Sequence, residues 1–532
     1  MTPMTAQSTT TTTASLAIAI FSTSSLFAEV KPSPLFTDGA VLQRGQDVPV
    51  WGTAREGEKI TVELGAQKLS TTAKDGKWRV DLKPLTAGGP FTMTLTGDNT
   101  VTVKDLLVGE VWICSGQSNM DFRFASSSTA AEDAPKSDFP QIRMFTVDKT
   151  PSLTPVAERG GSWVESSPKT VGKFSAVGYY FARDLHQKLG VPIGMIHTSW
   201  GGTPAQAWTS LEGFGNDPDL KNFAASAKKA LADQPSDPSV LKAKVDQYNA
   251  AKKAWDTNVG NDYQKTLNHW KVASAKAKKE GEPQPPRPAP STPPPVAPAN
   301  PGSSPNFPTS LYNGMIAPLV PYAIKGAIWY QGESNAGNSK QYRTLFPAMI
   351  ADWRAKWKLG DFPFLFVQIA PFNGQPPEIR EAQLLTLAKS KNTAMTVTTD
   401  VGNATNIHPA AKRPVGARLA LAARALAYGE KIEYSGPLYQ SMKAQDDTIT
   451  LNFTHVGGGL VAKDGDLKGF SIAGPDGTFV PARAEIRGEK VLVSAAGVSK
   501  PKAVRYGWAN VPDVNLFNEE GIPASPFRTD VD

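Results

Sequence analysis

The chain has 532 residues, which at about 150 residues per domain allows three or four domains. Its composition, 40% hydrophobic and 20% charged, is that of a globular protein with a large core and excludes wholesale disorder. A single cysteine, Cys114, excludes an internal disulfide and a four-cysteine metal site, and the 5 histidines form no H-E-x-x-H motif, so we expect no bound metal.

The formal net charge of +7 is a balance that many nucleic-acid-binding proteins share. The excess is local, however, because residues 221–282 contain 12 lysines against 7 acidic residues. No Lys/Arg-rich run is interleaved with aromatic residues, and the sequence has no RNA- or DNA-binding motif. We therefore do not expect nucleic acid as a partner.

Residues 1–28 resemble a secretory signal, with an apolar stretch over residues 14–21 and Ala28 at a suitable cleavage position. No Lys or Arg precedes Lys31, and Leu26 stands where a small residue is usual, so a Thr-rich tail is the alternative. No later apolar run reaches the roughly 20 residues of a bilayer span. We expect a secreted or periplasmic protein with no integral membrane span.

Strand patterns divide the rest of the chain into three regions. Residues 29–106 contain short β-rich runs between Gly, Asp and Lys turns, which predict a β-sandwich-like domain. In residues 107–430, apolar strands such as VWIC, IGMIHT and FLFVQIA alternate with helical stretches, which predicts an α/β domain with a parallel sheet. Strand-like runs return in residues 431–532, so we expect a second β-sandwich-like domain at the C-terminus.

An insertion at about residues 212–308 interrupts the α/β pattern. Apolar residues at helical spacing predict two amphipathic helices, which we expect to form a hairpin. Residues 283–308 then contain 12 prolines, a composition that favours an extended polyproline segment. A partner-binding arm and a tolerated surface insertion both fit, and the second is the commoner role of such a loop.

The segment VWICSGQSNM at residues 111–120 predicts a buried strand that runs into a sharp turn with Ser118 at its apex. Such a turn holds a hydroxyl at the carboxyl edge of a sheet and offers backbone N–H groups to an oxyanion. The segment lacks the second glycine of G-x-S-x-G, and serine is also a common helix cap. Ser118 is therefore a candidate nucleophile, with a helix cap as the alternative.

Two further strands end in turns that contain glycine. Gly201 and Gly202 follow IGMIHTSW, whereas Gln331 and Glu333 follow GAIWY. Because ligands of parallel sheets bind outside the carboxyl ends of the strands, these residues could line one crevice with Ser118. Turning the chain is the simpler role for each glycine.

Elimination leaves His408 as the preferred candidate for a general base. His269 lies in the insertion and His455 in the C-terminal β region, while His186 belongs to a helical run. His197 lies close to the glycine turn but on the strand itself, where we expect it to pack. His408 follows the strand AMTVTTD in the loop VGNATNIHPAAK, a common setting for a catalytic side chain.

Five blocks occur in order along the chain: CSGQSNM, WGGTPAQAW, LYNGMIAPLVPYAIKGAIWYQGESNA, IHPAAKRPVGARLALAARALAYGEK and GWANVPDVNLFNEEGIPASPFRTD. Together they resemble the sialate O-acetylesterase family, a branch of the SGNH-type hydrolases. The resemblance runs from about Leu35 to Asp532, outside the insertion. It implies a flavodoxin-like catalytic domain, hydrolysis of carbohydrate esters without a cofactor, Ser118 as nucleophile and His408 as base.

Three alternatives exist for the third member of a catalytic triad. Many relatives carry D-I-H, whereas this chain has N-I-H with Asn406. The resemblance offers Glu333 of Q-G-E as the acid, and the sequence itself offers Asp400, which could equally cap a turn. We favour Glu333, and a Ser118–His408 dyad oriented by a backbone carbonyl is the third alternative.

Together these residues lead us to expect that Ser118 attacks an acetyl carbonyl on a sugar. The oxyanion would accept hydrogen bonds from the N–H groups of Ser118 and of Gly201 or Gly202, and from the side-chain amide of Gln331. The expected substrate is 9-O-acetylated sialic acid or an acetylated polysaccharide such as xylan. A carbohydrate-binding protein that has lost catalysis is the alternative from another class, and the oligomeric state stays open.

Overall fold

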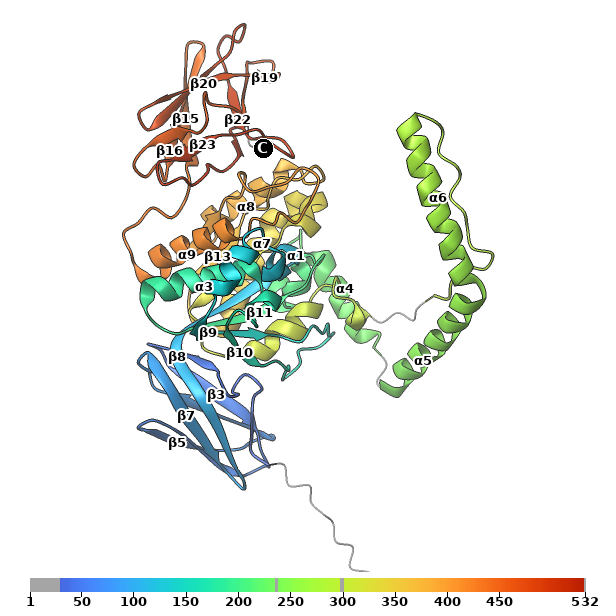
Figure 1. Cartoon of the computed structure of the whole chain (residues 1–532), viewed down its shortest axis with the longest axis vertical. Helices are drawn as coiled ribbons and strands as arrows, with labels where there is room; N and C mark the ends of the chain where they lie inside the picture. The colour runs from blue at the N-terminus through green and yellow to red at the C-terminus, as the bar shows by residue number, and fades with distance from the viewer. Residues whose placement is uncertain (1–28, 235–237, 297–300, 531–532) are drawn as a thin grey trace, which may run out of the picture.

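The structure, a computed structural model, describes residues 29–234, 238–296 and 301–530. The predicted signal segment, residues 1–28, lies outside the described residues. Figure 1 shows an N-terminal β part, a central α/β part and a C-terminal β part in a row, with a helical arm beside the centre. The predicted α/β class, with a central sheet and further β-sheets, is confirmed at this level.

The N-terminal β part is joined to the central part by a shared strand. Its own strands are β1 (Lys31–Pro32), β2 (Val41–Gln43), β3 (Val48–Thr53), β4 (Lys59–Leu64), β5 (Gln67–Thr72), β6 (Lys77–Leu82) and β7 (Gly88–Thr96). The long strand β8 (Thr100–Gly116) pairs with β7 in its first half and with strands of the central sheet in its second half. The boundary expected at residue 106 falls inside this strand.

The central sheet places three strand ends side by side. Its further strands are β9 (Phe139–Thr146), β10 (Trp163–Ser166), β11 (Ile193–Ser199), β12 (Gly326–Tyr330), β13 (Phe364–Val367) and β14 (Thr393–Thr396). The order is β10-β9-β11-β8-β12-β13-β14, and every pair is parallel except β9 with β10. Because β11, β8 and β12 are parallel neighbours, the segments after them meet at one carboxyl edge.

Helices cover both faces of the central sheet. They are α1 (Ser118–Asp121), α2 (Ala130–Asp133), α3 (Ala176–Leu189), α7 (Ser339–Trp357), α8 (Pro377–Lys389) and α9 (Arg413–Tyr428). α3 packs against α9, and α7 packs against α8. Trp112 of β8 contacts Phe181 of α3, whereas Trp329 of β12 contacts Trp353 of α7. Because Trp112 pairs with Gly326, the side chains of Trp112 and Trp329 lie on opposite faces of the sheet. The pair α3 and α9 therefore covers one face, and the pair α7 and α8 covers the other.

Short helical segments connect these elements. They are η1 (Phe124–Ser126), η2 (Ala134–Lys136), η3 (Val171–Lys173), η4 (Ala205–Trp208), η5 (Glu212–Phe214), η7 (Pro301–Ser303), η8 (Tyr312–Ile316), η9 (Ala317–Leu319) and η10 (Glu333–Asn338). Two of them follow the strands at the carboxyl edge: η4 comes after β11, and η10 comes after β12.

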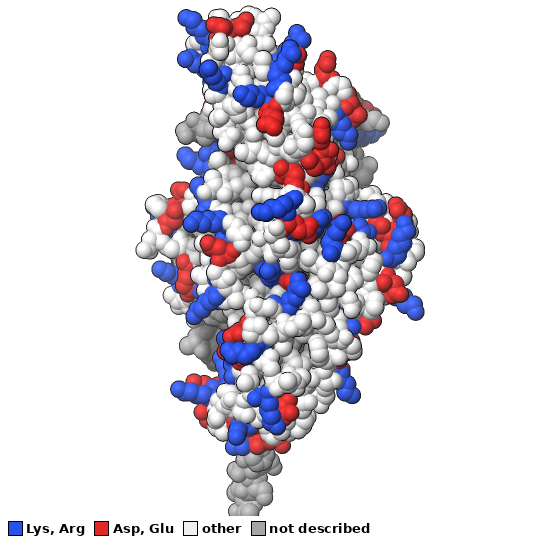
Figure 2. Space-filling model, turned by 90° about the vertical axis from the view of Figure 1, so that its left-hand side faces the viewer, with Lys and Arg blue, Asp and Glu red and all other residues white. Residues whose placement is uncertain are grey.

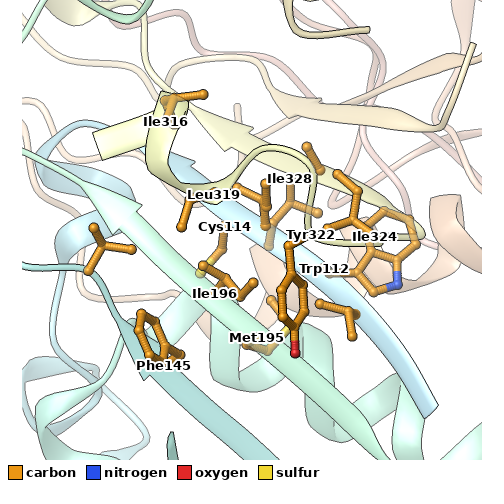
Figure 3. Close-up of a cluster of buried hydrophobic side chains, with 14 of the residues drawn as sticks. Trp112, Cys114, Phe145, Met195, Ile196, Ile316, Leu319, Tyr322, Ile324 and Ile328 are labelled. Atoms are coloured by element: carbon orange, nitrogen blue, oxygen red, sulfur yellow. The ribbon is translucent and has the colours of Figure 1, made fainter. Parts of the chain in front are cut away.

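The hydrophobic core of the central part surrounds β8 (Figure 3). Trp112 and Cys114 of this strand are buried among apolar side chains that include Tyr322 and Ile328. Burial raises the pKa of the Cys114 thiol, because the charged thiolate would lose its hydration. A Cβ on Gly178 of α3 would lie 3.0 Å from the Cys114 sulfur, so the helix approaches the strand closely at that point.

The C-terminal β part has its own core between two four-stranded antiparallel sheets, β15-β16-β21-β20 and β19-β18-β22-β24, beside the pair β17-β23. Its strands are β15 (Leu438–Gln445), β16 (Thr448–Thr454), β17 (Leu460–Ala462), β18 (Phe470–Ala473), β19 (Phe479–Pro481), β20 (Arg483–Arg487), β21 (Lys490–Ser494), β22 (Ala503–Tyr506), β23 (Leu516–Asn518) and β24 (Phe527–Arg528). Polar contacts hold it to α8 and to the residue that follows β13: Arg528 pairs with Glu381 over 2.7 Å, and Gln368 donates to Ser525 over 2.9 Å.

The arm does not contain the expected helical hairpin. α5 (Pro238–Trp255) and α6 (Asn261–Glu280) continue each other through the π-helical segment η6 (Asp256–Gly260), giving one bent helix (Figure 1). The hairpin expectation is wrong because residues 256–260 keep a helical backbone, and their single glycine does not reverse the chain.

The Pro-rich segment packs along the bent helix, as the second helix of the expected hairpin would have done. Going along α5–α6, Trp255 donates to the carbonyl of Thr292 over 2.7 Å, and Trp270 donates to that of Pro285 over 2.8 Å. The two segments therefore run antiparallel. An α-helix rises about 1.5 Å per residue and a polyproline helix about 3.1 Å, which explains why 15 helical residues match about half as many in the Pro-rich segment.

None of the described helices combines the length and apolar character that crossing a bilayer requires. Figure 2 shows one face of the molecule, on which basic and acidic side chains are interspersed.

The arm can be shortened without loss of stability only in the residues that follow α4 (Lys221–Ala232). Phe223 of α4 packs on Phe214 at 5.6 Å between ring centroids, and Ala224, Ala227 and Ala230 are buried. Replacing residues 235–300 with a short Gly/Ser linker should leave the melting temperature nearly unchanged. Replacing residues 221–300 should lower it by several degrees, because Phe214 loses its cover. Equal melting temperatures measured by calorimetry would contradict this assignment.

Candidate active site

Main-chain packing fixes the turn that carries Ser118. β8 ends at Gly116, which has a φ of 136°, and a Cβ there would lie 2.2 Å from the carbonyl oxygen of Tyr330. Only glycine fits such a close approach. The next residue, Gln117, donates its N–H to the same Tyr330 carbonyl over 2.9 Å, and its side chain accepts from the Ser334 N–H over 3.2 Å. Ser118 then begins α1 at the carboxyl edge of the sheet.

His408 reaches Ser118 from a loop far away in the sequence. Its Nε2 lies 2.8 Å from the Ser118 Oγ, a hydrogen bond between residues 290 positions apart. The imidazole is half-buried, and its backbone N–H donates to the Asn406 side chain over 2.9 Å. Burial lowers the pKa of His408, and the positive charge of Lys412 lowers it further. The imidazole therefore favours the neutral form that can take a proton from the serine.

His197, the other histidine near this edge, serves a different contact. It is buried in β11, and its Nε2 lies 2.6 Å from the Ser199 Oγ. Burial lowers the pKa of His197 to about 4, so the ring stays neutral in ordinary buffers. The sequence-based expectation that His197 packs within the strand agrees with this position.

Gly201 is the glycine of its pair that faces the nucleophile. A Cβ built on Gly201 would lie 3.2 Å from the Ser118 Cβ, whereas one built on Gly202 would meet no atom within 4 Å. Within the described ranges, neither the Ser118 N–H nor the Gly201 N–H has a protein acceptor. Ser118 and Gly201 are thus neighbours, and the backbone N–H of each is without a protein acceptor among the described residues.

The side chain of Gln331 is not available to an oxyanion, contrary to expectation. It is fully buried, and its Nε2 donates to the Thr203 carbonyl over 3.3 Å and to the Asn335 Oδ1 over 2.7 Å. An amide nitrogen has two hydrogens, and both are used here. Gln331 instead holds the segment that follows Gly201 and Gly202 against the turn after β12.

Neither expected carboxylate contacts the base. Glu333 is buried, and its Oε1 accepts from the Asn119 Nδ2 over 2.6 Å. Asp400 forms a two-pronged ion pair with Arg418, with distances of 2.8 and 2.5 Å. In the part of the chain that the structure describes, the His408 imidazole forms no hydrogen bond or ion pair with a carboxylate. The assignment of Glu333 as triad acid, and of Asp400 as its alternative, is therefore corrected.

Two residues that the sequence analysis did not single out lie in the centre of the site. Asn119 contacts Glu333, the Ile407 carbonyl and Lys412. Lys412 has no solvent exposure, although lysine is rarely buried without a partner. In the sequence, Asn119 could have been found only from its position directly after Ser118. No sequence pattern indicates that Lys412 is buried.

A Ser–His pair at the carboxyl edge of a parallel sheet is the arrangement of hydrolases that use a serine nucleophile. The family model for carbohydrate esterases of the sialic acid-specific acetylesterase kind matches residues 108–243 and 299–425. These two ranges include every residue discussed above as a candidate for catalysis. The gap between them, residues 244–298, lies in the arm.

Relatives match over nearly the whole chain. A solved structure of a carbohydrate acetylesterase from Xanthomonas citri is 36% identical with a TM-score of 0.76, and the match covers 94% of this chain and 100% of that one. The sialate O-acetylesterases of Rattus norvegicus and Homo sapiens are 29% and 28% identical, covering 90% of this chain and 90% and 88% of theirs. The chain therefore belongs to the sialic acid-specific acetylesterase family of carbohydrate esterases and is a carboxylic ester hydrolase, as the sequence predicted.

The corrected geometry predicts the behaviour of the two carboxylate variants. Loss of a triad acid costs about ten-thousandfold in kcat. Because neither carboxylate touches the imidazole, Glu333→Gln and Asp400→Asn should each lower kcat on an acetyl ester by far less. Asp400→Asn should also lower the melting temperature, since Arg418 loses its partner. A ten-thousandfold loss in either folded variant would restore that residue as the acid.

The pH dependence follows from the direction of the His408 shift. A general base acts in its neutral form, and the ordinary pKa of histidine is about 6.5. Since the pKa of His408 is lowered, kcat/KM should rise to its plateau with an apparent pKa below about 6.5. A stopped assay with an uncharged acetyl ester from pH 4 to 9 would measure this limb, and a limb above pH 7 would contradict the assignment.

Proposed function

We propose that this protein removes O-acetyl groups from carbohydrates, with Ser118 as nucleophile and His408 as general base. The 2.8 Å hydrogen bond between them is the observation that carries the proposal. His408 takes the proton of the Ser118 hydroxyl as the oxygen attacks the acetyl carbonyl. The imidazolium then gives this proton to the departing sugar oxygen, and water hydrolyses the acetyl-enzyme to acetate and free serine.

Two backbone donors would stabilise the negative oxygen of the tetrahedral intermediates. Gly201 lies against Ser118, and the N–H groups of both residues have no acceptor among the residues that the structure describes. Each such donor is typically worth about 3 kcal/mol. Gly202 faces open space, so it is the weaker candidate.

The fold supports placing the central part among the SGNH-type hydrolases. β10 forms one edge of the sheet, and β9 lies between β10 and β11. Without these two strands, the remaining parallel strands in chain order are β8, β11, β12, β13 and β14, and their spatial order is 2-1-3-4-5. That is the flavodoxin-like order of doubly wound sheets. The β-sheets at the two ends would then be accessory domains of a secreted or periplasmic enzyme, if residues 1–28 act as the export signal.

Sialic acid carrying a 9-O-acetyl group is the first candidate substrate, because the curated relatives are named sialate O-acetylesterases. An acetylated polysaccharide such as xylan is the second, because the relative from Xanthomonas citri is described only as a carbohydrate acetylesterase. Acetate release from acetylated sialosides and from acetylated xylan at equal acetyl concentration would distinguish them.

Variants of the pair test the chemistry itself. Ser118→Ala and His408→Ala should each lower kcat on p-nitrophenyl acetate by several orders of magnitude, and the double variant should lose little more, because the two groups act as one unit. Ser199→Ala is the matched control, since that serine also contacts a histidine but lies buried in β11. Substantial turnover by folded Ser118→Ala would refute the mechanism, whereas a lack of turnover by the wild-type protein would favour a carbohydrate-binding role.

A further inference from the structure

A buried polar network lies directly behind the Ser118–His408 pair, and the Asn119 side chain is its centre. The Asn119 Nδ2 donates to the Glu333 Oε1 over 2.6 Å and to the Ile407 carbonyl over 3.0 Å. Its Oδ1 accepts from the Lys412 Nζ over 2.5 Å. Because an amide nitrogen has two hydrogens, Asn119 uses its whole donor capacity on these contacts. The network thus joins α1, the turn after β12, the His408 loop and the start of α9.

Lys412 supplies the positive charge of this network. Its ammonium lies 4.9 Å from the Phe122 ring centroid and 5.1 Å from that of Tyr330, within the range of cation–π attraction. Burial lowers the pKa of Lys412 to about 7, and the negative charge of Glu333 opposes that shift. Burial likewise raises the pKa of Glu333. Each group would be costly to bury as an ion alone, so the two compensate each other across Asn119.

The network contacts residues that are adjacent in sequence to the two reacting residues, Ser118 and His408. Asn119 directly follows the nucleophile, and Ile407 directly precedes the base. The Asn119 side chain therefore ties the main chain beside the nucleophile to the main chain beside the base. A triad carboxylate normally fixes its imidazole through the second ring nitrogen. Here the base lacks a carboxylate partner in the described part of the chain, and its loop is held instead.

We propose that Lys412, acting through Asn119, is a positioning residue that takes over the orienting role of a triad acid: it fixes the His408 loop against Ser118. This inference rests on the proposed function, because it assumes that His408 is the base. Lys412 touches neither the Ser118 hydroxyl nor the imidazole through any contact found in the structure.

The charges around His408 support a direct electrostatic effect of Lys412. The charged groups on the surrounding elements are Glu333 in η10, Asp121 in α1, which pairs with Lys149, and the Asp400–Arg418 pair beside the loop. Of the charged groups, Lys412 is the one that lowers the pKa of His408, in addition to burial. Removing its charge should therefore raise that pKa, and the acidic limb of kcat/KM should move to higher pH.

Lys412→Met tests this proposal, with Arg413→Met as the matched control. The Arg413 guanidinium faces Glu132 and Asp133 at 3.8 and 3.7 Å, so its loss removes a neighbouring charge without touching Asn119. On p-nitrophenyl acetate, Lys412→Met should lower kcat by about tenfold or more with little change in KM, and should move the acidic limb upward by about half a pH unit. Arg413→Met should keep the wild-type values.

Lys412→Gln provides a second variant that keeps a neutral hydrogen-bond donor, and it should show the shifted limb with a smaller loss of kcat. Folded Lys412→Met with a wild-type limb and kcat would overturn the positioning role, as would equal effects of Arg413→Met. Failure of both Lys412 variants to fold would assign the residue to the core and also overturn it. These outcomes are separate from a failure of the proposed function, which folded Ser118→Ala tests independently of Lys412.

Discussion

Strand β8 is the constraint on which the rest of the structure depends. Its 17 residues belong first to the N-terminal β part and then to the centre of the parallel sheet. The strand ends at Gly116, where its backbone lies so close to Tyr330 that no side chain fits. A slip in its register would therefore disturb both parts and move Ser118 at once. The position of the nucleophile is set by backbone hydrogen bonds spread over the sheet.

The base, in contrast, is carried by a loop with local supports. The Asn403 side chain accepts from the N–H groups of Thr405 and Asn406, and the Asn406 side chain accepts from the His408 N–H. Such turns need only a side-chain oxygen two or three residues earlier, which asparagine provides as well as aspartate. The N-I-H sequence can therefore keep the shape of the loop while it lacks the charge of D-I-H. The positive charge of Lys412 does not replace that negative charge, because it lowers the pKa of His408 instead of stabilising the imidazolium.

The sequence predicts the class of the fold and the edge at which Ser118 and His408 meet, because alternating strands and helices imply a parallel sheet whose strand ends converge. The sequence also places Gln331 and Glu333 at this edge. The partners predicted for their side chains, the oxyanion for Gln331 and His408 for Glu333, are wrong. A sequence does not show which donors and acceptors are already used by buried neighbours such as Thr203, Asn335 and Asn119. The bend of the arm escaped prediction for a similar reason, since helical periodicity does not show whether two helices turn back or continue.

No local sequence pattern predicts the network around Lys412. Lys412 and Asn119 are 293 positions apart, and each looks like an ordinary polar residue in its own segment. Only the packing of the His408 loop onto α1 makes their side chains meet. Long-range polar pairs of this kind are specified by the whole fold. The motifs of a site assembled from distant loops can therefore be recognised in the sequence, whereas the residues that position them are found only in the structure.

The burial of Cys114 has a practical consequence for measurements on the arm. It is the single cysteine of the chain, it has no solvent exposure, and its thiol stays protonated at ordinary pH. Maleimide reagents need an accessible thiolate, so the native protein offers them almost no background. A cysteine introduced at Val272 of α6, whose side chain is 73% exposed, would be the sole reactive thiol. A fluorophore or spin label there would report how the bent helix moves relative to the enzyme body.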